Sequence, residues 1–182
     1  MATLYDSIEP QLVRFIERQH MFFVATAAET GRVNVSPKGL DTLRVLDSHR
    51  VIWLNGTGSG NETAAHVALN PRMTVMFCAV EDKPWILRLY GIARCVQPGD
   101  DDFEDLLAAF PPLLGSRQIF DMTVSACQTS CGFGVPLFSY EGQRDLMHRW
   151  ADTRGPEGVR AYQRKHNARS LDGFDAHLPG AG

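Results

Sequence analysis

Hydrophobic positions near the start of the chain follow a helical period and then change to short strand-like runs. Over residues 7–19 the apolar residues recur at steps of three and four: Ile8, Leu12, Phe15 and Ile16. This spacing predicts an amphipathic helix. Runs rich in β-branched and aromatic residues follow it at 21–27, 32–36, 43–46 and 51–54. Because turn residues separate these runs, they predict an antiparallel meander.

The rest of the chain adds strands and a few helices to this pattern. Strands are expected at 73–80, 85–96 and 119–127, and helices at 61–70, 100–110 and about 144–168. Six or more strands with few helices favour a closed β-barrel. The segment 144–168 is a charged helical extension anchored by Trp150 and Tyr162. The Gly- and Pro-containing end from Leu171 onward is expected to be mobile.

Composition narrows the class of protein without identifying it. With 182 residues and 44% hydrophobic residues, the chain is expected to form a single domain over residues 1–182. It carries 18 Lys plus Arg against 21 Asp plus Glu, without a basic cluster, so nucleic acid is not an expected partner. No apolar run reaches the length of a membrane span, which predicts no membrane association and a cytoplasmic location.

The cysteines and histidines do not predict a metal centre. Cys127 and Cys131 are separated by three residues rather than the two of redox and zinc pairs, and Cys78 and Cys95 lie in strand-like runs. The six histidines are scattered along the chain. We therefore expect Cys78 and Cys95 to be structural thiols, and we expect no disulfide and no metal site.

The strongest local motif is the stretch Asn55-Gly56-Thr57-Gly58-Ser59-Gly60-Asn61-Glu62-Thr63, between a predicted strand and a predicted helix. Glycines let backbone N–H groups approach an anion, hydroxyls donate to its oxygens, and the helix start adds a positive dipole. The alternative is a capping box between Ser59 and Glu62, in which the polar groups only satisfy the helix's own N–H groups. The local pattern favours neither interpretation.

Two further segments carry polar groups beside a strand end. In Asn34-Val35-Ser36-Pro37-Lys38-Gly39 the proline is expected to stop ladder pairing, and the lysine is a cation suited to a phosphate or a reduced flavin ring. In Gln128-Thr129-Ser130-Cys131-Gly132 the side chains offer donors to ring carbonyls, whereas a tight barrel corner explains the same glycine-rich pattern.

Four features, in this order along the chain, resemble the pyridoxamine 5'-phosphate oxidase-like flavoprotein family. They are the N-terminal helix, Val35-Ser36-Pro37-Lys38, Gly58-Ser59-Gly60-Asn61-Glu62-Thr63, and Asn70-Pro71-Arg72 before an apolar strand. The resemblance runs from about Leu12 to about Tyr140. It implies a mainly β fold with flanking helices, a six-stranded antiparallel split β-barrel of Greek-key type. It also implies a homodimer with FMN at the interface and redox chemistry on a small-molecule substrate.

The resemblance also implies roles for individual residues. The set expected to bind FMN comprises Val35, Ser36, Pro37, Lys38, Gly39, Thr57, Gly58, Ser59, Gly60, Asn61, Thr63, Arg88, Gln128 and Ser130. The flavin itself is expected to carry the chemistry, without a catalytic side chain. The alternatives are a deazaflavin-dependent reductase and a flavin- or haem-binding dimer without turnover. No side chain in the Gly60–Thr63 stretch is positive, so Lys38, Arg88 or a partner arginine must compensate the phosphate charge.

Overall fold

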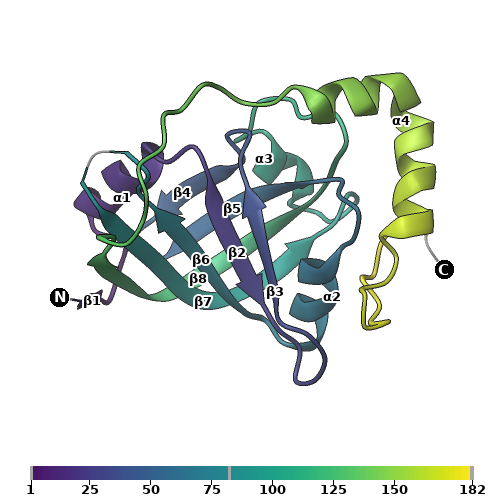
Figure 1. The fold of residues 1–182 in the computed structure, drawn as a ribbon. Helices are drawn as coiled ribbons and strands as arrows, with labels where there is room; N and C mark the ends of the chain where they lie inside the picture. The colour runs from purple at the N-terminus through teal and green to yellow at the C-terminus, as the bar shows by residue number, and fades with distance from the viewer. Residues whose placement is uncertain (1, 82, 181–182) are drawn as a thin grey trace.

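The computed structural model describes residues 2–81 and 83–180, which form one antiparallel sheet with helices at its margins (Figure 1). The elements are β1 (Thr3–Tyr5), α1 (Pro10–Glu17), β2 (Phe22–Thr26), β3 (Asn34–Lys38), β4 (Leu43–Asp47), β5 (Arg50–Gly56), α2 (Glu62–Leu69), β6 (Arg72–Cys78), β7 (Trp85–Val96), α3 (Phe103–Leu107), β8 (Ser116–Cys131) and α4 (Leu146–His166). The predicted mainly β class with flanking helices is confirmed.

The sheet differs from the expected closed six-stranded barrel. It has eight strands within the described residues, in the order β3-β2-β6-β7-β8-β5-β4, with β1 paired to β8. β3 and β4 follow each other in sequence but end opposite edges of this path, so the meander is interrupted and the path is open. Leu40 and Asp41, both at positive φ, make the connection between them. Pro37 lies within β3 opposite Phe23 rather than ending the ladder, and an edge strand tolerates it because one side needs no donors.

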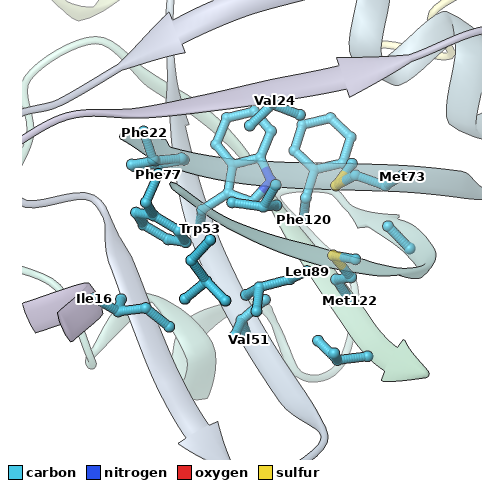
Figure 2. Packing of buried hydrophobic residues seen from close by; sticks show 14 of the residues in the cluster. Ile16, Phe22, Val24, Val51, Trp53, Met73, Phe77, Leu89, Phe120 and Met122 are labelled. Carbon is cyan, nitrogen blue, oxygen red and sulfur yellow. The ribbon is translucent and has the colours of Figure 1, made fainter. Parts of the chain in front are cut away.

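The main core fills the concave side of this sheet. Trp53 of β5 lies at its centre, with its ring stacked on Phe120 at a centroid distance of 4.5 Å, and Phe22 meets it edge-on (Figure 2). Ile52 and Leu54, one residue to either side of Trp53, belong to a smaller cluster with Phe103 of α3. Because side chains alternate along a strand, β5 is buried on both faces.

β8 pairs with three strands, β7, β5 and β1, and it is longer than predicted. It runs to Cys131 and pairs with β7 from Ile119 to Cys131, so Gln128 and Ser130 lie in the sheet rather than in a loop after it. The register shifts once, between Tyr90 and Gly91. At this bulge the strands come so close that a Cβ on Gly91 would lie 1.9 Å from the carbonyl oxygen of Thr123.

After β8 the chain crosses the end of the sheet to reach α4, and the segment after α4 lies beside α2 (Figure 1). α4 is kinked at Gly155, which adopts φ 66° ahead of Pro156. In the segment after α4, Phe174 packs against the main core and Ala176 is buried. Composition alone predicted a mobile end from Leu171 onward. In the structure, Phe174 and Ala176 of this segment pack against the core.

Candidate functional site

A cavity of about 630 Å³ opens between β3, the start of α2, β8 and the segment after α4. We call it the loop cavity. Its lining comprises Asn34, Ser36, Pro37, Lys38, Asn55, Gly56, Gly58, Ser59, Gly60, Asn61, Glu62, Thr63, Arg117, His166, Arg169, Ser170 and Leu171. Strand alternation explains one wall, because Asn34, Ser36 and Lys38 share a face of β3 while Val35 is exposed. Residues far apart in sequence therefore meet at one polar concavity.

The glycine-rich loop forms the floor of the loop cavity and leads into α2. Asn61 is the N-cap residue of α2, and its side chain makes no capping hydrogen bond. The Glu62 carboxylate instead accepts the backbone N–H of Leu171, at 2.9 Å and 3.1 Å for its two oxygens. The capping box between Ser59 and Glu62 is thus absent, which favours the anion-binding interpretation of this loop. Glu62 instead fastens the C-terminal segment.

Two cations, Lys38 and Arg117, lie at the inner end of the cavity. Arg117 is only 4% exposed and donates to the carbonyl oxygen of Gly60 at 2.9 Å, which joins it to the glycine-rich loop. The Lys38 ammonium donates to Asn55 Oδ1 at 3.3 Å and lies 5.1 Å from the Trp53 ring centroid. Neither cation forms an ion pair within residues 2–81 and 83–180.

Burial without a counter-ion disfavours the charged form of both side chains. Burial, followed by the nearby Arg117 charge, lowers the pKa of Lys38 to about 8. Burial also lowers the pKa of Arg117 to about 10. A fold rarely keeps such cations unpaired, because desolvation is costly unless an anion offsets it. The pair therefore indicates a site for an anionic ligand group.

Buried polar atoms near these cations also lack hydrogen-bond partners. In the described part of the chain they include Arg117 Nε, Asn61 Nδ2 and Gln118 Oε1. Asn61 Oδ1 accepts from Gln118 Nε2 at 2.8 Å, which leaves the Asn61 amide donors free. Because buried polar groups are nearly always satisfied, the two donors, Arg117 Nε and Asn61 Nδ2, match an oxygen-rich ligand.

Of the fourteen residues predicted to bind cofactor, the structure brings most to the loop cavity: Ser36, Pro37, Lys38, Gly58, Ser59, Gly60, Asn61 and Thr63. Thr57 does not line it, because its hydroxyl donates to Gly115 O and accepts from Gln163, both at 2.7 Å. Gly39 lines a neighbouring cavity.

Val35, Arg88, Gln128 and Ser130 lie elsewhere, on the outer face of the sheet. Arg88 is opposite Gln128 in the β7–β8 register and donates to the Ser130 hydroxyl at 3.2 Å. None of the four lines the loop cavity of its own chain. A role for them in cofactor binding therefore requires a second copy of the chain.

The predicted binding set left out Asn34 and Asn55, although both stand in the candidate segments, and sequence reasoning missed four other residues of the cavity: Arg117, His166, Arg169 and Ser170. Arg117 had one available signal, since it is the one Lys or Arg within the β8 sequence Ser116–Cys131. His166, Arg169 and Ser170 follow the region of family resemblance, which ends at about Tyr140, and no sequence motif marked them as site residues. Asn167, fully buried, holds their segment against the loop by donating to Gly58 O at 3.0 Å.

Three of the four cysteines, Cys78, Cys95 and Cys127, lie within sheet strands and have raised thiol pKa values. Burial raises the pKa of Cys95 to about 12 and that of Cys127 to about 11, and it also raises the pKa of Cys78. Low-pKa thiolates are the reactive form, so these cysteines have a structural character. Across the described ranges, no group of three or more His, Cys, Asp or Glu side chains is placed to hold a metal ion. Nor is any helix there long and apolar enough to cross a membrane.

Comparison with solved structures reveals similar folds at low sequence identity. A HupZ variant from Group A Streptococcus superposes with a TM-score of 0.54 at 17% identity, covering 68% of this chain and 99% of that one. A Lactobacillus delbrueckii protein, provisionally assigned as a pyridoxamine 5'-phosphate oxidase, gives a TM-score of 0.55 at 17% identity over 68% and 94% of the two chains. These likenesses concern the fold alone.

Sequence comparison identifies the family, which the structural likenesses do not. The family model described as pyridoxamine 5'-phosphate oxidase matches residues 8–131. The Aspergillus flavus pyridoxamine 5'-phosphate oxidase family protein ustO is 34% identical over 198 aligned residues, covering 99% of this chain and 78% of that protein. This second match includes the region after residue 131, where part of the loop cavity is built. The chain therefore belongs to the pyridoxamine 5'-phosphate oxidase family.

Proposed function

We propose that this protein is an FMN-dependent oxidoreductase that acts on a small-molecule substrate as a homodimer. The observation that carries the proposal is the pair Lys38 and Arg117, which face the glycine-rich loop without a carboxylate partner among the described residues. Two cations and a row of backbone N–H groups suit a terminal phosphate. Membership of a flavin-binding family supports FMN as the ligand that carries this phosphate.

The chain's own groups divide into a phosphate end and a ring end. Arg117, Lys38 and the Gly58–Gly60 backbone would hold the phosphate, with Asn61 Nδ2 as a further donor. Asn34 and Ser36, whose side chains bond each other at 3.3 Å, would orient the ring along β3. When bound, FMN supplies hydride or electron transfer. A volume of about 630 Å³ lies within the range of pockets that enclose ligands of this size.

The homodimer part of the proposal is supported by the outer face of the sheet. Val33, Val35 and Ile92 are 72%, 58% and 56% exposed there or at its margin. Arg88 and Gln128 lie on the same face. Apolar side chains gathered around polar ones are typical of an interface between subunits.

The direct test compares FMN with riboflavin, which has the same ring and no phosphate. We expect FMN to bind with flavin fluorescence quenching, and riboflavin to bind at least about 100-fold more weakly, because two charge-assisted contacts are lost. Equal affinities would rule out the phosphate assignment. Reduced nicotinamide with an artificial acceptor then tests turnover. A Soret band in the purified protein would instead favour the haem-binding alternative. Absence of flavin binding would favour the deazaflavin or ligand-free alternatives.

The affinity for FMN should also depend on pH through Lys38. With a pKa of about 8, Lys38 is protonated below this pH and neutral above it, so binding should weaken as pH rises through about 8. We expect a loss approaching tenfold per unit once Lys38 is neutral, measured by titration between pH 7 and 9. Arg117 stays charged over this range because its pKa is about 10. In Lys38→Met the dependence should vanish. A wild-type affinity that is flat over this range would contradict the role of Lys38.

A further inference from the structure

A second cavity of about 600 Å³ adjoins the loop cavity and shares Pro37 and Lys38 with it. It lies beyond the end of β3, between the C-terminal end of α1, the end of β6 and residues 138–147. The shared residues put a ligand in this second cavity directly next to the strand along which the proposed flavin ring lies. This position suits the molecule that exchanges electrons with a cofactor.

Residues 138–147, which build one wall of the second cavity, follow the region matched by the family model. The wall is fastened at both ends. Phe138 N–H donates to Val80 O at 2.9 Å, and Tyr140 N–H donates to a Glu81 carboxylate oxygen at 2.9 Å. The Gln143 amide accepts from Leu40 N–H at 3.2 Å and donates to His20 O at 3.3 Å. One wall of the second cavity therefore exists because residues 138–147 pack against the rest of the chain.

The second cavity combines apolar and aromatic walls with a positive rim. Phe15 and Met147 line its interior, and the His20 and Tyr140 rings are stacked at 3.6 Å with an interplanar angle of 7°. Arg18 and Arg144 line it as well, and neither forms an ion pair with any described residue. The lining carboxylate, Glu81, is hydrogen-bonded to the backbone of Tyr140.

We propose that the second cavity is the substrate site and that it takes a small aromatic carboxylate. The aromatic body would stack against the Tyr140 and His20 pair, because planar rings favour offset stacking on an exposed ring face. The carboxylate would lie at the rim between Arg18 and Arg144, whose guanidinium groups match its two oxygens. As a substrate assignment it rests on the proposed function, whereas the binding site itself can be tested without FMN.

The test uses 2-naphthoate as probe and 2-naphthalenemethanol as its uncharged counterpart, both titrated calorimetrically into the full chain. We expect one naphthoate per chain, bound at least about tenfold more tightly than the alcohol and weakened by salt. Arg18→Ala with Arg144→Ala should lose about tenfold for naphthoate and little for the alcohol. Tyr140→Ala should weaken both compounds, because it removes the stacking surface.

The matched control is Arg160→Ala with Arg164→Ala, which removes the same charge from exposed positions on α4 that do not line the second cavity. Naphthoate affinity should be unchanged in this control. Equal binding of the two probes, or equal losses in both arginine pairs, would overturn the inference. If FMN binds while naphthoate does not, the proposed function stands and this inference fails. If naphthoate binds while FMN does not, the substrate role fails.

Discussion

Arg117→Met should lower the affinity for FMN by about 30- to 1,000-fold, which corresponds to about 2–4 kcal/mol. The guanidinium is buried near Lys38 and donates to Gly60 O, and its buried Nε has no hydrogen-bond partner among the described residues. Its contact with phosphate would be made away from bulk water, where charge-assisted hydrogen bonds are strong. Isothermal titration or flavin fluorescence measures the loss.

The same substitution should leave the ligand-free protein folded. A buried cation without a counter-ion costs free energy, so we expect methionine of similar length to change the free energy of unfolding by no more than about 1 kcal/mol in the destabilising direction. Arg117→Lys keeps the positive charge but loses the planar set of guanidinium donors, so its affinity for FMN should lie between those of the wild type and Arg117→Met. Arg160→Ala serves as the control on α4. An Arg117→Met protein that binds FMN like the wild type would refute the phosphate site.

Gly91→Ala should destabilise the protein by about 3 kcal/mol or more, because its Cβ would lie 1.9 Å from Thr123 O. The obstacle is backbone of β8, held in the β7–β8 ladder, rather than a side chain that can turn away. Relief of the clash requires the two strands to separate at the bulge. Chemical denaturation followed by circular dichroism measures the change in the free energy of unfolding.

Gly134→Ala is the matched control for Gly91→Ala. A Cβ at Gly134 meets nothing within 4 Å, and its φ is not positive. We expect a change of less than about 0.5 kcal/mol for this surface substitution. If the two alanine variants unfold at the same denaturant concentration, the close approach of β7 and β8 at the bulge is not present in the native protein.

Local patterning was sufficient for much of the fold. The bounds of β7, residues 85–96, agree with the prediction. Pro84 and Pro98 flank a long apolar run, and such a run between two prolines favours a single extended strand. The glycine-rich turn before α2 was also readable, since loop and helix start are adjacent in sequence. The segment around Ser36 and Lys38 was also singled out from the sequence, and the structure places both residues at the loop cavity.

Other features depended on strand pairing, which acts across long sequence distances. Consecutive runs suggested that β4 would continue the meander from β3, yet β3 pairs with β2 alone and β4 with β5 alone. β8 pairs with β5, with Gln118 opposite Asn55, and this pairing is what carries Arg117 to the glycine-rich loop. The pattern around Arg117 does not show which distant strand pairs with β8, and the position of Arg117 depends on that pairing.

The sequence by itself therefore located the local parts of the candidate site, which are the segment around Ser36 and Lys38 and the glycine-rich loop over residues 57–63. For that loop it left anion binding and helix capping as alternatives. The tertiary structure alone decided that the inner cation is Arg117 and that Glu62 and Gly58 hold the C-terminal segment over the cavity. The physical reason is that propensity and periodicity act between near neighbours. Burial of an unpaired charge depends instead on which distant segments pack around it.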